Sequence, residues 1–300
     1  MTPGAKCYIG TSGWSYPTGE GTWKEYFYPA GTKNELEYYS QFFDTVEVNS
    51  SFYRPPSPGI TFNWARRVPS HFRFAVKLWQ KFTHPAMFKE ATGEEPAVSA
   101  ADVSAFQSSL EPLAAAGKLG IILAQFPPGF TANTRNRERI IAIHEAFSAY
   151  PLAVELRHRS WTDDSGTAQL LRERNITWVE IDEPKFSTSI APEVPATSDI
   201  AYFRFHGRNA REWWHGTAET RYRYLYNAEE INELAAKVRR RMENTRFLYA
   251  YFNNHWQAYA PRNASDLKRA LGLPVVDFQM QMQFPEEEKK GMPFGGDDFA

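Results

Sequence analysis

The segment 151-PLAVELRHRSW-161 places a short apolar strand pattern between two helical patterns. The helical patterns cover residues 137–149 before it and residues 165–174 after it. A strand between two helices predicts a parallel sheet, because parallel strands need crossover connections that are usually helical. Yet Glu155 and Arg157 carry charge where a buried strand is expected to be apolar.

The same alternation recurs along the whole chain. Eight β-rich runs cover residues 7–11, 45–53, 72–77, 119–126, 152–157, 176–182, 200–206 and 247–253. Helical patterns cover residues 34–43, 60–67, 99–116, 137–149, 165–174, 229–243 and 265–271. Eight repeats of this kind predict an α/β fold, namely a (β/α)₈ TIM barrel with eight parallel strands.

The domain organisation follows from length and from the absence of a linker. Three hundred residues fit one such barrel, so we expect a single domain over residues 1–284. Residues 285–300 are charged and glycine-rich, and we expect a poorly ordered tail there. Residues 183–198 show no helical periodicity, which predicts an irregular barrel around the sixth helix.

Composition narrows the class of partner. A net charge of −1 gives no general attraction to nucleic acid or anionic membranes. The single cysteine, Cys7, cannot form an internal disulfide, which suits a reducing compartment. No signal-peptide core and no run near the ~20 apolar residues of a membrane span occur in the sequence. We therefore expect a cytoplasmic protein that does not associate with membranes.

Polar residues alternate with apolar ones in six of the strands, so the polar set of each strand shares one face. The set includes Glu47, Asn49, Arg73, Lys77, Glu155, Arg157, Glu180, Asp182, Tyr202, Arg204, His206, Tyr249, Tyr251 and Asn253. Helices should cover the apolar face, so we expect the polar face to line the barrel and to meet at the carboxyl ends of the strands. The alternative is an internal salt-bridge network that only fills the barrel.

Aromatic residues follow the strands at the same end. They are Trp14, Tyr16, Phe52, Tyr53, Trp79, Phe82, Trp161, Trp213, Trp214 and Trp256. Such a rim could stack on a sugar face or a nucleobase. Loops that pack on one another as a lid over the barrel mouth are the alternative.

Seven motifs occur in order and resemble those of the YecE-like family, a domain of unknown function with a TIM-barrel fold. They are IGTSGWSY, VEVNSSFYRPP, FAVKLWQKFTH, LAQFPPGF, VELRHRSW, YFRFHGR and YFNNHWQAYAPRNA, between about residues 9 and 271. The resemblance implies a fold rather than an activity. The similarity of these barrels to the endonuclease IV and xylose isomerase group implies phosphodiester or DNA binding as one possibility.

The resemblance also marks individual positions. The residues that match the family motifs are Trp14, Glu47, Asn49, Tyr53, Lys77, His84, Gln125, Glu155, Arg157, Arg204, His206, Gly207, Asn253 and Asn254. The chain departs from the family pattern at His255 and Trp256, which stand where smaller residues are expected.

Three cations are expected to converge at the barrel mouth. Lys77, Arg157 and Arg204 end three different strands and suit a phosphate or carboxylate ligand. Nearby Glu47, Glu155 and Asp182 could instead neutralise them. We expect a small anionic ligand, held by these cations together with Glu47, Asn49, Tyr53, Gln125, Asn253, Asn254, Trp14 and Trp161.

Catalysis, if present, is expected from His206 with Glu155 or Asp182, because imidazole titrates near neutrality and a carboxylate can orient it. A hydrogen-bonded core histidine is the alternative for His206. Lys77 could also act as a Schiff-base lysine. The sequence contains no GxGxxG, Walker or GxSxG motif.

We expect no metal and no other cofactor. A site built from Glu47, Glu155, Asp182 and His206 is conceivable, but His206 is the one histidine with inward strand parity, and nearby cations disfavour a divalent metal. The alternatives are an endonuclease IV-like, metal-assisted phosphodiesterase that acts on nucleic acid, and a non-catalytic barrel that binds nucleic acid or protein.

Overall fold

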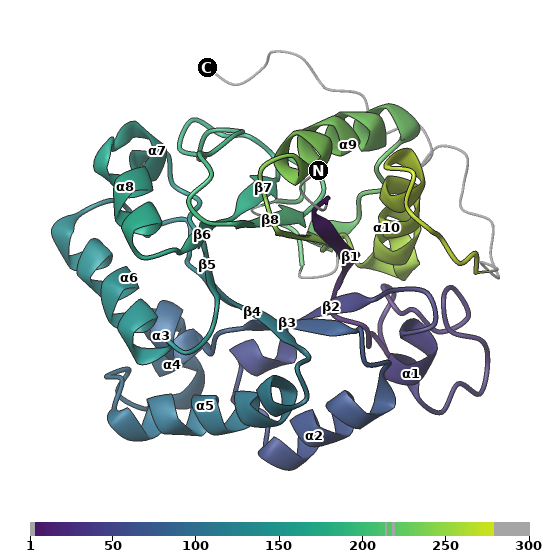
Figure 1. Ribbon diagram of the computed structural model, residues 1–300, viewed down its shortest axis with the longest axis horizontal. Coiled ribbons are helices and arrows are strands. Elements are labelled where there is room, and N and C mark those ends of the chain that lie inside the picture. The colour runs from purple at the N-terminus through teal and green to yellow at the C-terminus, as the bar shows by residue number, and fades with distance from the viewer. Residues whose placement is uncertain (1–3, 214, 218–219, 279–300) are drawn as a thin grey trace.

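A computed structural model of the chain describes residues 4–213, 215–217 and 220–278. The expected tail at residues 285–300 lies outside these residues. Figure 1 shows helices arranged around a central ring of strands. The predicted α/β architecture with a TIM-like barrel is confirmed.

The barrel consists of parallel strands in the order β6-β5-β4-β3-β2-β1-β9-β8-β7. Their bounds are β1 Lys6–Ser12, β2 Thr45–Val48, β3 Arg73–Lys77, β4 Leu119–Gln125, β5 Leu152–Glu155, β6 Thr177–Trp178, β7 Glu180–Asp182, β8 Ile200–Phe205 and β9 Phe247–Phe252. Only Val179 separates β6 from β7; β6 pairs with β5, and β7 pairs with β8. β6 and β7 together therefore occupy one strand position. Counted this way, the nine strands of the described chain correspond to the eight strand positions expected of a barrel.

Helices alternate with the strands along most of the chain. They are α1 Glu35–Tyr39, α2 Pro58–Arg67, α3 Gln80–Thr83, α4 Pro85–Thr92, α5 Ala100–Ala115, α6 Thr134–Ala146, α7 Ser160–Asp163, α8 Gly166–Glu173, α9 Ala228–Met242 and α10 Tyr259–Ala270. Three 3₁₀ turns, η1 Ser50–Phe52, η2 Thr220–Tyr222 and η3 Trp256–Ala258, complete the elements. The short pieces η1, α3 and α7 follow β2, β3 and β5, so they lie at the carboxyl end of the barrel.

Local sequence explains where the long outer helices begin. Ser99 and Asp102 form a capping box at the start of α5, and Asn227 and Glu230 form one at the start of α9. Each box satisfies backbone N–H groups that lack partners within the helix. In α9 the last turn carries three arginines, which complement the helix dipole.

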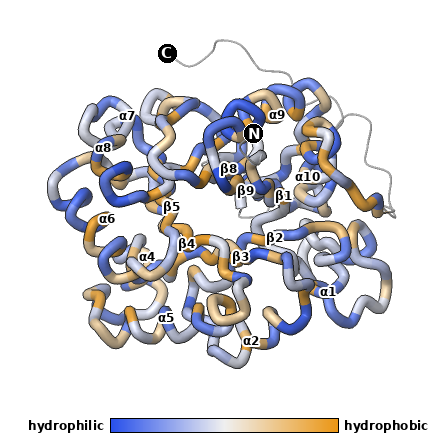
Figure 2. The backbone as a smooth tube through the Cα atoms, in the orientation of Figure 1, coloured by the Kyte–Doolittle hydropathy of each residue, from blue (hydrophilic) through white to orange (hydrophobic). Residues whose placement is uncertain are grey.

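Apolar side chains of the strands lie between the barrel and the helices. Val154, Leu156 and Phe203 are buried there, as the alternation predicts. Figure 2 shows hydrophobic residues gathered on β4 and β5. Burial of each such side chain stabilises the fold by about 1.5–3 kcal/mol.

The predicted irregularity is confirmed after β7. Residues 183–199, all of them described, form no helix and run from β7 directly to β8. This segment folds back over the end of β5, where His158 bridges Ser189. The expectation of a single domain stays a prediction. Among the described helices, none has the length and apolar character needed to cross a membrane.

Candidate functional site

A pocket of about 390 Å³ opens at the carboxyl ends of the strands. Its lining residues come from loops and strand ends around the barrel: Gly13, Trp14, Ser15, Tyr16, Asn49, Ser50, Phe52, Tyr53, Lys77, Gln125, Arg157, Arg204, His206, Tyr222, Asn253 and His255. The backbone of Gly13 has φ of +87°, a left-handed conformation that favours glycine. A side chain there would meet the Tyr16 hydroxyl at 2.7 Å. Glycine thus lets the loop after β1 close over the pocket.

Arg204 lies at the floor of the pocket between two carboxylates. Its Nε donates to Glu47 Oε2 at 2.9 Å, and its Nη2 donates to Glu47 Oε1 at 2.7 Å. Its Nη1 donates to Glu155 Oε2 at 2.6 Å. The side chains of Arg204, Glu47 and Glu155 are 2%, 0% and 0% exposed, so the cluster is cut off from bulk water. Such buried charges persist only because each is paired.

Arg157 extends this cluster toward the loop after β7. Its Nε donates to Glu155 Oε1 at 2.7 Å, and its Nη1 lies 3.2 Å from Glu183 Oε2. Its Nη2 lies 3.2 Å from His206 Nε2. Because a guanidinium only donates, Nε2 of His206 is the acceptor of any hydrogen bond in this contact. Nδ1 of His206 lies 3.0 Å from Asn253 Nδ2.

The pairing decides which of these groups titrate near neutrality. Burial opposes the ionised forms of Glu47 and Glu155. Arg204 nevertheless holds the pKa of the Glu47 carboxyl below its usual value, and Arg157 and Arg204 together do the same for Glu155. Burial, together with the positive charges of Arg157 and Arg204, lowers the pKa of His206 to about 4 against the opposing effect of Glu155. At pH 7 the two carboxylates are therefore charged and His206 is neutral.

Lys77 differs from both arginines. Among the described residues, no carboxylate lies within ion-pair distance of its Nζ, and the nitrogen lies 4.0 Å from the centroid of the Phe52 ring. Burial, together with the positive charge of Arg204, lowers the pKa of Lys77 to about 7. The ring contact favours the ammonium form, but a cation–π contact is worth only about 0.5–2 kcal/mol. A substantial fraction of Lys77 is thus the neutral amine at pH 7.

The aromatic rim is partly as expected. Trp14 and Tyr53 line the pocket, and Tyr53 is 69% exposed. The unusual His255 also lines it and stacks on Tyr16, with ring centroids 4.5 Å apart. Trp161 does not reach the pocket; it is buried, and its Nε1 donates to the carbonyl of Phe130 at 2.6 Å. The rim is therefore both a wall of the pocket and a set of packed loops.

Three of the four predicted amides line the pocket. Gln125 donates to the carbonyl of Phe126 at 3.0 Å, and Asn253 contacts His206. The side-chain oxygen of Asn49 is buried and has no hydrogen-bond partner among the described residues. Asn254 lies outside the pocket lining and donates to the carbonyl of Tyr224 at 2.8 Å and to Asn263 Oδ1 at 2.8 Å. Asn254 thus supports the loop before α9.

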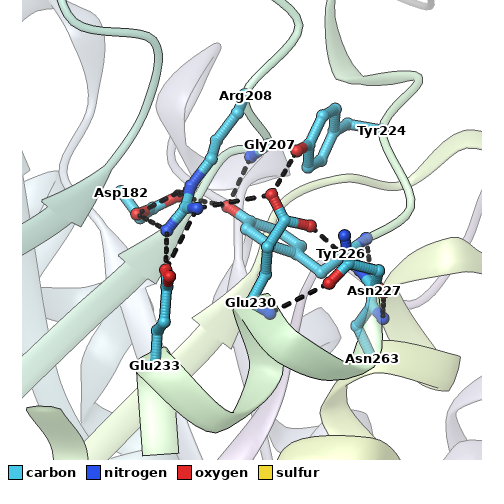
Figure 3. A network of polar contacts seen from close by, with 9 residues as sticks. All are labelled: Asp182, Gly207, Arg208, Tyr224, Tyr226, Asn227, Glu230, Glu233 and Asn263. Carbon is cyan, nitrogen blue, oxygen red and sulfur yellow. Dashed lines mark hydrogen bonds and ion pairs between the residues drawn. The ribbon is translucent and has the colours of Figure 1, made fainter. Parts of the chain in front are cut away.

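The structure does not bring Asp182 into the pocket. Its carboxylate accepts from Arg208 Nη2 at 2.9 Å and from the Tyr226 hydroxyl at 2.8 Å (Figure 3). Its strand neighbour Glu180 pairs with Arg241 of α9, also outside the barrel. The expectation of inward parity is therefore wrong for this strand. The alternation itself is regular here, because Ile181 pairs in register with the inward Arg204; it is the apolar set of this strand that faces the barrel interior and the polar set that faces α9.

Figure 3 shows that Asp182 belongs to a network which fixes the segment after β8. Arg208 also contacts Glu230 and Glu233 of α9, each at 3.3 Å. Gly207 donates its N–H to the Tyr226 hydroxyl at 2.9 Å, and Tyr224 donates to Glu230. This network anchors both ends of the segment that carries Tyr222 into the pocket wall.

The comparison with protein families is decisive for membership. The profile of the family described as "Protein of unknown function DUF72" matches residues 8–289. The chain belongs to the DUF72 family. The predicted YecE-like resemblance is thereby confirmed.

Relatives of this DUF72 chain are similar along nearly their whole length. UPF0759 protein YunF of Bacillus subtilis (strain 168) is 29% identical over 279 residues, which cover 89% of this chain and 95% of YunF. A DUF72 protein structure from Thermotoga maritima MSB8 is 36% identical, with a TM-score of 0.77, covering 89% of this chain and 99% of the other. A DUF72 structure from Enterococcus faecalis V583 is 26% identical, with a TM-score of 0.77, covering 91% and 99%.

The donor set of this DUF72 chain does not assemble as a metal site needs. Among the described residues, no group of three or more His, Cys, Asp and Glu side chains is placed to hold a metal ion. Glu47 and Glu155 direct their oxygens to Arg204, while Asp182 lies on the other side of the strand. The four conceivable ligands are thus divided between two networks.

Sequence reasoning missed Glu183 and Tyr222 of this DUF72 chain. Glu183 approaches Arg157, taking the place expected for Asp182, and its signal is its position directly after β7. Tyr222 lines the pocket from η2, in a segment without a strand or helix pattern, so no sequence signal marks it.

Proposed function

We propose that the protein binds a small molecule with a phosphate or carboxylate group in the pocket at the barrel mouth and acts on it by metal-independent acid/base chemistry. The observation that carries this proposal is the Lys77 amine, which lines the pocket without a carboxylate partner among the described residues. A partly buried cation without a partner is costly, and an anionic ligand would relieve that cost.

The distribution of charge supports Lys77 as the principal anion partner. Arg204 directs three nitrogens to Glu47 and Glu155, and Arg157 contacts Glu155, Glu183 and His206. These arginines contribute to the local field, but their hydrogen-bonding capacity is largely committed. Lys77 is the pocket cation whose ion-pairing capacity remains available among the described residues.

Acid/base roles follow from the protonation states. A general acid or base works best when its pKa lies near the working pH. Lys77, with its pKa lowered to about 7 by burial and by Arg204, meets that condition. In this proposal His206 is a neutral hydrogen-bonding group, and Glu155 holds Arg157 and Arg204 in place.

Calorimetric titration tests the proposal with two ligands, sn-glycerol 3-phosphate and D-glycerate. We expect one of them to bind the wild type and Lys77→Met to weaken that binding at least tenfold, which corresponds to about 1.4 kcal/mol. Lys89→Met is the control, because Lys89 pairs with Glu95 at an exposed site. Equal binding by the wild type and Lys77→Met, or binding of neither ligand, would refute the proposal.

A further inference from the structure

We propose that Lys77 forms an imine with a small, hydroxylated 2-oxo acid. This inference rests on the proposed function and names its substrate class. Lys77 Nζ lines a pocket of about 390 Å³, near the lower end of the range for small-molecule sites. Because its ion-pairing capacity is unused among the described residues, the nitrogen is available to a ligand.

An amine must be unprotonated to attack a carbonyl carbon, and the surroundings of Lys77 favour that state. Burial and the nearby Arg204 disfavour the ammonium form and lower the pKa of Lys77 to about 7. Relative to an ordinary lysine, the neutral fraction at pH 7 rises about 10³-fold. Schiff-base lysines are activated in this way, by desolvation or by another cation.

A 2-oxo acid satisfies the charge of this site both before and after the reaction. The carboxylate next to the carbonyl attracts Lys77 in its protonated form. The carbonyl carbon is open to attack by Lys77 in its neutral form. The protonated imine keeps a positive charge at the same nitrogen, so the carboxylate remains paired. A plain phosphate ester could use only the ammonium form.

Hydroxyl recognition is inferred from Asn49. Asn49 lines the pocket, and its side-chain oxygen is buried and accepts no hydrogen bond from the described residues. A buried acceptor without a partner is costly, and a ligand hydroxyl would supply the missing donor. Trp14 and Tyr53 add apolar faces for the carbon skeleton.

The reaction balances without any further reagent. The nitrogen lone pair forms a bond to C2 of the oxo acid, and the C=O π electrons move to oxygen. One proton then passes from nitrogen to oxygen and gives a carbinolamine. The C–O bond breaks, the oxygen takes a second proton from solvent and leaves as water, and the nitrogen keeps one hydrogen in the protonated imine.

Reductive trapping at pH 7 tests the inference with 3-hydroxypyruvate, pyruvate and cyanoborohydride. Hydride addition converts the imine to a stable secondary amine, which intact-mass measurement and peptide mapping locate. We expect a single adduct at Lys77, formed several-fold faster with 3-hydroxypyruvate than with pyruvate. Asn49→Ala should reduce the rate with 3-hydroxypyruvate to that with pyruvate.

Two variants and one further ligand complete the test. Lys77→Arg should form no adduct at this position, and Lys89→Arg should behave as the wild type. Adducts spread over many lysines, or none at Lys77, would overturn the imine. If D-glycerate binds but 3-hydroxypyruvate gives no adduct at Lys77, the imine is wrong and the proposed function stands. If sn-glycerol 3-phosphate and D-glycerate do not bind and no adduct forms, both are wrong.

Discussion

Arg204 holds Glu47 through two parallel hydrogen bonds, Nε to Oε2 at 2.9 Å and Nη2 to Oε1 at 2.7 Å. Planar, bidentate pairs of this kind are the strong form of the arginine–carboxylate interaction. The Tyr202 hydroxyl donates to the same Oε2 at 2.7 Å, and Glu155 takes the third nitrogen of Arg204. The pair thus joins β2, β5 and β8 at the floor of the pocket.

Removal of Arg204 is expected to destabilise the protein strongly. Arg204→Met leaves Glu47 and Glu155 buried without their shared cation, which costs about 3–5 kcal/mol in the free energy of unfolding. Urea unfolding measures the loss. Arg159→Met is the control, since Arg159 and Asp163 form an exposed pair worth at most about 1 kcal/mol. Similar losses in the two variants would contradict the importance given to this cluster.

Lys77→Met is expected to stabilise the fold at pH 7 by about 1–4 kcal/mol. The folded pKa of Lys77, lowered to about 7 by burial and Arg204, lies below its unfolded value of about 10.5, so the unfolded chain binds the proton more tightly. Wild-type stability should therefore rise between pH 7 and 10.5, and the advantage of the variant should shrink. Urea unfolding at pH 7 and 9.5 measures both the stability gain of the variant and its decrease with pH. A variant less stable than the wild type at pH 7 would contradict the prediction.

His206 should make stability fall as the pH drops from about 6.5 to 4. Burial and Arg157 lower its folded pKa to about 4, below the unfolded value of about 6.5, so acid protonates the unfolded chain first. One such group changes the unfolding free energy by up to about 1.4 kcal/mol per pH unit. His206→Gln should show a smaller loss between pH 6.5 and 4.5 than the wild type. Identical slopes would show that His206 is not held in the neutral form.

Asp182→Asn is expected to weaken the fold without impairing the pocket amine. The substitution removes charge from the contacts of Asp182 with Arg208 and Tyr226, at a cost of about 1–3 kcal/mol. The rate at which acetic anhydride acylates the Lys77 amine should stay within about twofold of the wild-type rate. Glu233→Gln, at a half-exposed member of the same network, should cost less than about 1 kcal/mol. Loss of Lys77 reactivity in Asp182→Asn would show that Asp182 does influence the pocket.

The sequence predicted the barrel because strand and helix periodicities are local properties of the chain. The inward positions of Glu47, Lys77, Glu155, Arg157, Arg204 and His206 also followed from the two-residue period of a strand. Asp182 was placed wrongly because alternation shows which residues share a face but not which face points inward, and here Glu180 and Asp182 face outward to pair with Arg241 and Arg208. Which cation stays unpaired depends on distances between strands far apart in sequence, so Lys77 could not be distinguished from Arg157 and Arg204.

The most direct test of the central claim is the pH dependence of acylation at Lys77, measured by competitive labelling with acetic anhydride and peptide mass spectrometry. The neutral amine is the reactive form, so the labelling rate reports its fraction. We predict a midpoint near pH 7 at Lys77, where burial and Arg204 lower the pKa to about 7. A midpoint near pH 10 at Lys77 would contradict the account.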